Sequence, residues 1–243
     1  LKKALPPTLA TRTLYTCGIP ESVAADRVGE MLDRFPSVTA AYCARPSCVD
    51  IRLTACPESA DELDQACDVV KREFGNAVMP EGSRDVAEAL GHLLYERGLT
   101  LAVAESCTGG GVGSAVTDIP GASAYFRGGI IAYSNTVKET LLYVRNATLA
   151  AKGAVSAETA DEMLTGTQRA FDADTAICVT GIPGPGGGTA DKPTGLVFIG
   201  TAVGPDRDVK RFVFPGSRSR VRERTVTMAL NQLRLQILAP GEA

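Results

Sequence analysis

The sequence predicts two units, a small α+β domain over residues 1–79 and a three-layer α/β/α sheet domain over residues 80–243. The chain has 243 residues, which suits one large or two modest domains. Hydrophobic residues make up 44% and charged residues 22%, the balance of a soluble globular protein. Gly, Asn and Pro are frequent over 75–85, between two segments whose hydrophobic patterns differ. We therefore place the boundary in that stretch.

The first segment has the order strand, helix, two strands and helix. Its predicted elements are a strand over 11–19, an amphipathic helix that Pro20–Glu21 opens and Pro36–Ser37 ends, a hairpin of 38–44 and 48–54 around the turn 45–47, and a helix over 58–74. Small α+β units of this kind bind RNA in other proteins. Here we find no GxxG loop and no pair of aromatic residues on adjacent strands. A structural or dimerising spacer is the favoured interpretation.

The second segment alternates helices with short apolar strands. The predicted helices cover 86–97, a stretch from about Ser106, 137–142, 158–171 and 219–238, and the predicted strands cover 99–104, 129–133, 175–179, 195–203 and 211–214. Apolar strands between helices predict a sheet covered on both faces. Ligands of such sheets bind at the carboxyl ends of the strands, so we expect the catalytic and binding residues to follow the strands.

Charge and cysteine usage exclude several classes of protein. Twenty-five Lys and Arg against 28 Asp and Glu give a net charge of −3, which does not favour nucleic acid as a partner. Seven cysteines without a CxxC pair, and the single His92, form no metal-ligand pattern. We expect reduced, mostly buried thiols in a cytoplasmic protein without metal, cofactor or membrane segment. Residue 1 is leucine, as in a fragment or a processed chain.

The strand over 99–104 is followed by the sequence ESCTGGG, residues 105–111. A serine between a strand and a helix start has its hydroxyl near unpaired backbone N–H groups. Those groups and the helix dipole stabilise an oxyanion, and glycines let a substrate approach the backbone closely. Ser106 is therefore a candidate nucleophile. The alternative is a simple helix cap, which serine often provides.

A nucleophilic serine needs a base, and the choice is narrow. His92 precedes Leu93 and Leu94 in a predicted helix, so we expect it to pack against other helices. Lys138 follows the strand over 129–133 and is the remaining candidate, provided that burial lowers its pKa. The alternative for Lys138 is a solvated position on a helix surface.

Two further features suit an anionic ligand. The loop TGIPGPGGGT, residues 180–189, is rich in backbone N–H groups but matches neither a Walker A nor a Rossmann pattern. Seven cations lie between 207 and 224, and Arg218 and Arg222 share one face near the start of the last helix. Such a pair fits one phosphate better than a polyanion. A flexible loop and a solvated helix surface are the alternatives.

Residues 86–238 resemble the carboxyl-terminal domain of the CinA (competence/damage-inducible) family, also called PncC, the nicotinamide mononucleotide deamidases. The resemblance rests on AESCTGG (104–110), TDIPGASAYFRGGIIAYSN (117–135), GAVSAETA (153–160), VTGIPGPGGGTADKPTGLV (179–197) and the arginines that open the last helix. Residues 9–79 resemble the KH-like linker domain of full-length CinA proteins. The further amino-terminal domain of those proteins, which resembles molybdopterin-binding domains, has no counterpart in this sequence.

The resemblance implies hydrolysis of the carboxamide of nicotinamide mononucleotide to nicotinic acid mononucleotide and ammonia. It implies Ser106 as nucleophile, Lys138 as base, and Tyr133, Thr180 and Arg218 as further catalytic residues. We expect Thr180 to hydrogen-bond Ser106 or Lys138, and Arg218 to contact the phosphate or lower the pKa of Lys138. The expected substrate contacts are Cys107, Thr108, Gly109, Gly110, Asn135, Gly181, Gly184, Gly186, Gly187 and Arg222, the last being the second choice for the functional arginine.

Two alternatives accompany this hypothesis. Cys107 is the rival nucleophile, although it has no obvious histidine partner. The whole domain could instead be a nucleotide-binding or regulatory module linked to competence or DNA damage. In either case we expect a homo-oligomer, with a dimer favoured.

Overall fold

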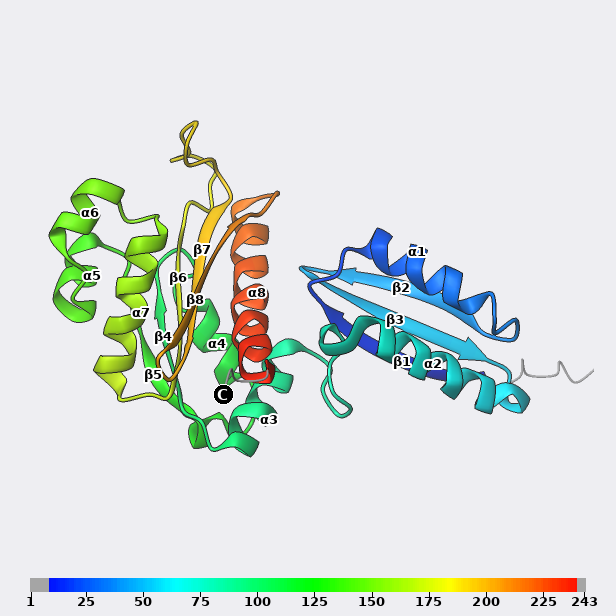
Figure 1. The fold of residues 1–243 in the computed structure, drawn as a ribbon. Helices are drawn as coiled ribbons and strands as arrows, with labels where there is room; N and C mark the ends of the chain where they lie inside the picture. Colours follow the sequence, from blue (N-terminus) through cyan, green and yellow to red (C-terminus); the bar gives the residue numbers. More distant parts are fainter. Residues whose placement is uncertain (1–8, 240–243) are drawn as a thin grey trace, which may run out of the picture. The chain divides into compact units, whose positions relative to one another are not determined.

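The computed structural model describes residues 9–239 and divides the chain into two compact units between Asp85 and Val86 (Figure 1). The division falls at the end of the stretch 75–85, where glycine and proline are frequent. Each unit has its own sheet and its own helices. Among the described residues, no helix is both long and apolar enough to cross a membrane.

The first unit is a three-stranded antiparallel sheet with both long helices on one face. Its elements are β1 (Ala10–Cys17), α1 (Glu21–Leu32), β2 (Thr39–Arg45), β3 (Cys48–Ala55), the 3-10 turn η1 (Pro57–Ser59), α2 (Ala60–Phe74) and the 3-10 turn η2 (Gly75–Ala77). The strand order is β1-β3-β2. Leu14, Ile51 and Leu53 from the sheet pack with Val28 and Leu63 from the helices. The predicted α+β arrangement is confirmed.

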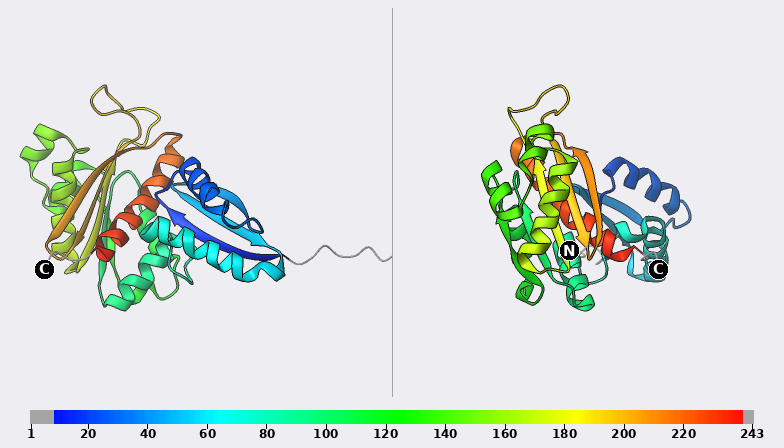
Figure 2. Two further views of the ribbon diagram at one scale, coloured as in Figure 1. Left: turned by 45° about the vertical axis from the view of Figure 1, so that its right-hand side comes forward. Right: turned by 60° about the vertical axis from the view of Figure 1, so that its left-hand side comes forward.

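The second unit has three layers around a five-stranded sheet, as predicted. Its elements are α3 (Val86–Arg97), β4 (Leu101–Glu105), α4 (Gly111–Thr117), η3 (Ala122–Ala124), β5 (Phe126–Ile131), α5 (Asn135–Leu142), α6 (Asn146–Lys152), α7 (Ala157–Phe171), β6 (Thr175–Gly181), β7 (Leu196–Val203), β8 (Asp206–Val213) and α8 (Arg218–Leu238). Helices α3, α4 and α8 cover one face, and α5, α6 and α7 cover the other (Figures 1 and 2).

The sheet of the second unit is mixed, in the order β5-β4-β6-β7-β8. Strand β4 lies parallel to both β5 and β6, whereas β7 is antiparallel to β6 and to β8. The carboxyl ends of β4, β5 and β6 therefore meet at one edge of the sheet. The segments that follow these three strands carry Ser106, Lys138 and the glycine-rich loop.

Several predicted boundaries were wrong. Helix α4 begins at Gly111 instead of near Ser106, because Gly109 and Gly110 adopt positive φ angles of 59° and 95° and interrupt the helical path. Strand β5 ends at Ile131, which leaves Tyr133 in the connection to α5. Strand β8 is longer than predicted, because its many charged residues obscure the strand pattern. The short helix α6 was not predicted.

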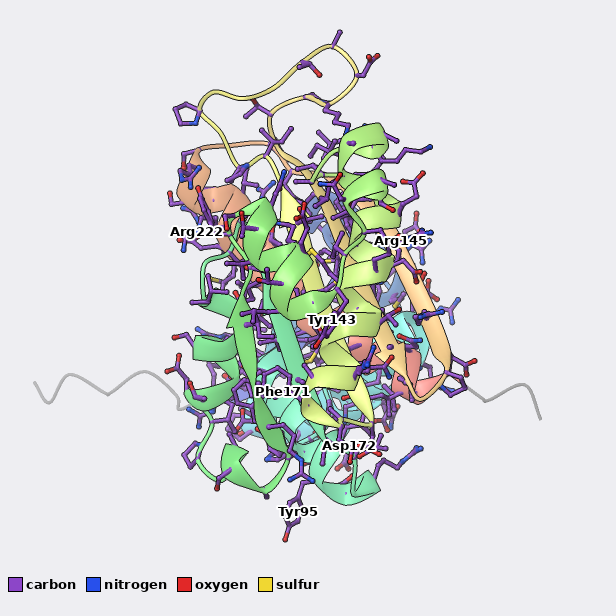
Figure 3. The ribbon with its side chains drawn as sticks, turned by 90° about the vertical axis from the view of Figure 1, so that its left-hand side faces the viewer. Tyr95, Tyr143, Arg145, Phe171, Asp172 and Arg222 are labelled. Atoms are coloured by element: carbon purple, nitrogen blue, oxygen red, sulfur yellow. The ribbon has the colours of Figure 1, made fainter. Side chains whose placement is uncertain are left out.

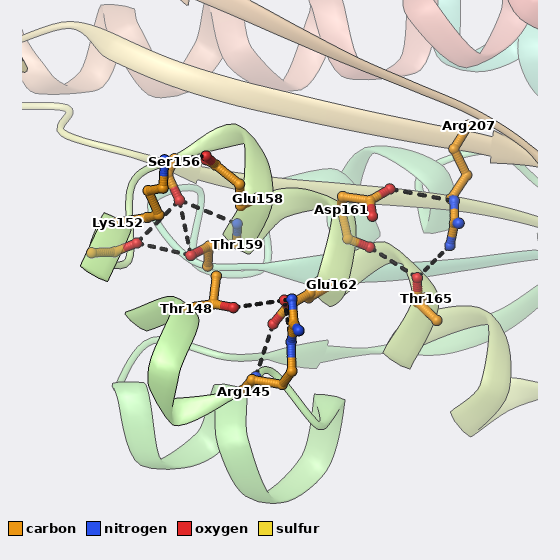
Figure 4. A network of polar contacts seen from close by, with 11 residues as sticks. Arg145, Thr148, Lys152, Ser156, Glu158, Thr159, Asp161, Glu162, Thr165 and Arg207 are labelled. Atoms are coloured by element: carbon orange, nitrogen blue, oxygen red, sulfur yellow. Dashed lines mark hydrogen bonds and ion pairs between the residues drawn. The ribbon is translucent and has the colours of Figure 1, made fainter. Parts of the chain in front are cut away.

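The face formed by α5, α6 and α7 is held together by polar contacts at the helix starts. The connection between α5 and α6 carries Tyr143 (Figure 3). The centroid of its ring lies 5.0 Å from the guanidinium carbon of Arg169. Glu162 of α7 accepts hydrogen bonds from the Arg145 backbone N–H at 2.8 Å and the Thr148 hydroxyl at 2.7 Å (Figure 4). Ser156 caps α7 by accepting from the Thr159 N–H. These contacts fix α7 as the support for α5.

A close approach between α7 and the end of α5 generates a stability prediction. A Cβ added at Gly166 would overlap the backbone carbonyl of Leu142, which cannot rotate away. We expect Gly166→Ala to lower the free energy of unfolding of the second unit by about 3 kcal/mol, as overpacking does. Urea denaturation measures this change.

The matched control is Gly29 in α1, a helical glycine in open surroundings. A Cβ there would meet no atom within 4 Å. We expect Gly29→Ala to stabilise the first unit by about 0.5–1 kcal/mol through helix propensity alone. Equal effects of the two substitutions would contradict the tight approach of α7 to α5.

Candidate active site

The site centres on a buried amine beside a serine hydroxyl. Ser106 directly follows β4, and its backbone N–H donates to the Val179 carbonyl of β6 at 3.0 Å. Lys138 lies in α5, whose start is capped by the Ser134 hydroxyl. The Lys138 Nζ atom is 3.2 Å from Ser106 Oγ, and the lysine is only 1% exposed. Lys138 is therefore not the solvated helix residue of the alternative interpretation.

The environment of the amine favours its neutral form. Burial lowers the pKa of Lys138, and the nearby Cys107 acts weakly in the opposite direction. The Lys138 Nζ atom donates to the carbonyl oxygens of Ala132 at 2.6 Å and Tyr133 at 3.3 Å. A neutral amine has two N–H donors and one lone pair. The Nζ atom also donates to the Ser106 hydroxyl oxygen at 3.2 Å. Once the amine is neutral, two N–H groups suffice for the carbonyls and its lone pair can accept the hydroxyl proton.

The start of α4 is occupied by a carboxylate from the protein itself. The Glu105 side chain is 2% exposed and accepts from the backbone N–H groups of Gly110, Val112 and Gly113 at 2.8–3.0 Å. Sequence reasoning missed this role. A glutamate at the end of an apolar strand, just before a glycine-rich helix start, was the available signal.

This carboxylate changes which amides can stabilise an oxyanion. The Gly110 N–H is held by Glu105, and the Gly109 N–H donates to the Ser106 carbonyl at 3.2 Å. Within residues 9–239, the Thr108 N–H has no hydrogen-bond acceptor, and the Cys107 N–H bonds the sulfur of its own side chain. They are the remaining backbone donors beside Ser106. Of the amides over 107–110 that were expected near the oxyanion, those of Gly109 and Gly110 have acceptors within the protein.

Cys107 is poorly suited to be the nucleophile. Its side chain is buried, and burial raises the pKa of its thiol to about 12. A thiol reacts through its thiolate, which such a pKa disfavours at neutral pH. The neighbouring Thr108 has a buried hydroxyl oxygen without a hydrogen-bond partner, which leaves one polar group available next to the site.

Thr180 is buried at the end of β6 but does not contact Ser106 or Lys138 by hydrogen bonding. Its hydroxyl donates to the Ala154 carbonyl at 2.7 Å, so it fixes the segment between α6 and α7. Gly181 pairs with Val197 of β7, where a Cβ would overlap the backbone of that strand. Thr180 therefore holds the segment before α7 in place, and Gly181 allows the close approach of β6 and β7 at the edge of the site.

Two arginines join the first turns of α8 to the loops of the site. The Arg218 Nη1 atom donates to the Gly184 carbonyl in the glycine-rich loop at 2.8 Å. The Arg222 Nη2 atom donates to the Thr108 carbonyl at 2.7 Å. Arg218 is not among the causes of the lowered Lys138 pKa, which burial dominates. Both guanidinium groups keep further N–H donors for an anion.

The other predicted contacts lie around this centre. Tyr133 is 65% exposed and contributes its backbone carbonyl to Lys138, and Asn135 is the first residue of α5. Gly186 and Gly187 lie in the exposed part of the glycine-rich loop. The described residues contain no group of three or more His, Cys, Asp or Glu side chains that could hold a metal ion.

Comparisons with known proteins agree along both units. Residues 83–237 match the family model "CinA C-terminal domain", and residues 11–80 match "Damage-inducible protein CinA KH domain". A "Putative competence-damage inducible protein" of Clostridium novyi is 36% identical over 99% of this chain and 59% of its own length. A "CinA-like protein" of a Synechococcus species is 40% identical over 96% of this chain and 57% of its own length. The chain thus spans under two thirds of these relatives.

Solved structures match about two thirds of the chain. The competence/damage inducible protein of Agrobacterium tumefaciens is 36% identical, with a TM-score of 0.60, and the match covers 66% of this chain and 99% of that one. A CinA superfamily protein of Klebsiella pneumoniae is 31% identical, with a TM-score of 0.61, and the match covers 63% of this chain and 96% of that one. These two structures share the fold and 31–36% of the aligned residues with this chain.

The role of Glu105 generates a prediction about stability. We expect Glu105→Gln to lower the free energy of unfolding by about 2 kcal/mol, because an amide provides one acceptor oxygen where the carboxylate provides two, and loses the charge. Chemical denaturation followed by circular dichroism measures the loss. The same change at the exposed Glu96 of α3 is the control, with an expected effect within about 0.5 kcal/mol. Equal effects at both positions would contradict the anchoring role.

Proposed function

This chain belongs to the CinA family, and we propose that its second unit hydrolyses the carboxamide of nicotinamide mononucleotide to nicotinic acid mononucleotide and ammonia. The observation that carries the proposal is the buried Lys138 amine, 3.2 Å from the Ser106 hydroxyl. The nature of the substrate rests on the resemblance of the motifs around Ser106, Lys138 and the glycine-rich loop to those of the deamidases.

The proposed chemistry is an acyl transfer through Ser106. Neutral Lys138 takes the hydroxyl proton while Ser106 Oγ attacks the carboxamide carbon. The N–H groups of Cys107 and Thr108 stabilise the resulting oxyanion, a type of contact that contributes roughly 3–4 kcal/mol per donor. Protonated Lys138 then gives the proton to the departing ammonia. Water hydrolyses the acyl-enzyme by the reverse use of the same groups.

Lys138 can perform both proton transfers because its surroundings do not fix its charge. No carboxylate is among the causes that shift its pKa, so no ion pair holds it in the protonated form. The carbonyls of Ala132 and Tyr133 hold the nitrogen in place in either state. The short distance to Ser106 limits the motion that each transfer needs.

The two arginines of α8 supply the proposed phosphate contacts. Arg218 and Arg222 are already oriented by the Gly184 and Thr108 carbonyls, so a phosphate would meet pre-positioned donors. This arrangement favours the nucleotide over the corresponding riboside. In this proposal, the anionic end of the substrate binds between the glycine-rich loop and the Ser106 turn.

Ammonia release from nicotinamide mononucleotide tests the proposed reaction. We expect Ser106→Ala and Lys138→Ala each to lower kcat/KM by at least about 10³-fold, because each removes one member of the nucleophile–base pair. The matched controls are the exposed Ser114→Ala and Lys210→Ala, which should keep normal rates in proteins of unchanged circular dichroism.

The outcomes of this assay separate the alternatives. Full activity of Lys138→Ala would remove the assigned base, and full activity of Ser106→Ala would remove the assigned nucleophile. A wild-type chain that binds nicotinamide mononucleotide without releasing ammonia would favour the nucleotide-binding module instead.

The lowered pKa of Lys138 predicts the pH dependence of the reaction. Lys138 acts as a base only when it is unprotonated, so kcat/KM should rise with pH and level off above the pKa of the free enzyme. Because burial lowers that pKa, the midpoint of the rise should lie below the ordinary lysine value of 10.5. A pH–rate profile measures it. A midpoint at or above the ordinary value would contradict a neutral amine at Ser106.

A further inference from the structure

Two cysteines of the first unit face each other across neighbouring strands. Cys17 ends β1, Cys48 begins β3, and they are direct partners in the antiparallel register. At the next position the Gly18 N–H donates to the Ser47 carbonyl at 2.8 Å. Hydrogen-bonded and non-hydrogen-bonded positions alternate along such a ladder, so the cysteine pair occupies a non-hydrogen-bonded position. Opposite side chains approach most closely at such positions.

The two cysteine side chains share the sheet face opposite the helices. The Cys17 thiol hydrogen-bonds the sulfur of Cys48. Val49, the residue after Cys48, belongs to the apolar core under the helices, and alternation along the strand turns Cys48 to the other face. Cys17 is 2% and Cys48 7% exposed. Both cysteines are thus buried, but neither belongs to the apolar core of the first unit. Packing in that core therefore does not account for them.

The charges around Cys48 favour its reactive form. The hydrogen bond from Cys17 is the largest cause that lowers the pKa of the Cys48 thiol, and the Arg45 guanidinium adds to it. Arg45 is the direct partner of Cys48 on β2. Burial, Asp50 and Asp85 act in the opposite direction without reversing the shift. By contrast, burial raises the pKa of Cys178 to about 12.

We propose that Cys17 and Cys48 form a redox-active dithiol that closes to an intramolecular cross-strand disulfide when a peroxide oxidises it. The Cys48 thiolate attacks one peroxide oxygen, forming a sulfenic acid, and the other oxygen leaves as water after taking up a proton. The Cys17 sulfur then attacks the sulfenic sulfur and expels the second water. Two thiols and one hydrogen peroxide give one disulfide and two waters, and a reduced dithiol reverses the reaction.

Closure would tie β1 to β3 around the segment that contains α1 and β2. A crosslink over residues 17–48 restricts the unfolded chain and leaves the folded strands in their register. Oxidation therefore stabilises the first unit. This inference concerns the first unit alone and does not depend on the reaction proposed for the second.

Peptide mapping of the full chain tests the proposal. Trypsin releases Cys17 in the peptide 13–27, where it is the only cysteine, and Cys48 in 35–52, where the Arg45–Pro46 bond resists cleavage. That second peptide also carries Cys43, so the experiment uses Cys43→Ser. After brief treatment with hydrogen peroxide and alkylation of the remaining thiols, we expect the two peptides to be linked, and dithiothreitol to separate them.

Thermal unfolding provides the second readout. We expect oxidation to raise the Tm of the first unit by about 10 °C, reversibly with dithiothreitol. Cys17→Ser and Cys48→Ser should each abolish both the linked peptide and the rise in Tm. Cys67→Ala, which removes a buried thiol of the same unit, should keep both.

Two results would overturn the proposal. In the first, peptides 13–27 and 35–52 remain separate under peroxide while the exposed Cys56 is oxidised. In the second, the crosslink joins two chains, as gel mobility without reductant would reveal. Both results come from the Cys43→Ser protein alone, so they stand even if a cysteine-to-serine change in the pair prevents folding.

Discussion

The burial of one lysine amine without a carboxylate partner is the constraint on which the candidate site depends. A protonated amine removed from water loses hydration that two neutral carbonyls do not replace. Burial therefore lowers the pKa of Lys138 and stabilises the neutral amine relative to the protonated one. The position of this amine depends in turn on the Ser134 cap and on α7, which packs against α5 where Gly166 lets the backbones approach. The contacts around Glu162 therefore serve the site although none of them touches it.

The mixed sheet explains why the site forms at one edge. Strands β4, β5 and β6 are parallel, so the segments after them converge and bring together Ser106, Lys138 and the glycine-rich loop. The antiparallel β7 and β8 then return the chain to α8, which places Arg218 and Arg222 at the same edge. The parallel strands thus bring Ser106 and Lys138 together, and the chain that leaves the antiparallel strands brings the two arginines to the same edge.

Glu105 accepts hydrogen bonds from the backbone N–H groups at the start of α4, so these groups are not open to a ligand. The start of a helix attracts anions, and here an internal carboxylate satisfies those N–H groups. A substrate oxyanion is left with the turn amides of Cys107 and Thr108, which lie closer in sequence to Ser106. The carboxylate thus gives the turn a fixed shape, and catalysis in the proposed reaction uses the donors that the turn leaves open.

The sequence by itself determined the order of the elements in both units except for the short helix α6, the family, and the two chemical groups that the proposed reaction needs. Apolar periodicity and glycine-rich motifs are local signals, so they are readable without coordinates. Local patterns predicted the wrong boundaries in two places. Glycines with positive φ shift the start of α4 towards the carboxyl terminus, and charged residues obscure the strand pattern over most of β8. Only the tertiary structure decided that Lys138 is buried beside Ser106, that Thr180 bonds Ala154, and that Cys17 meets Cys48. Each of these contacts joins residues at least 26 positions apart, and burial and strand register, which no local pattern encodes, set them.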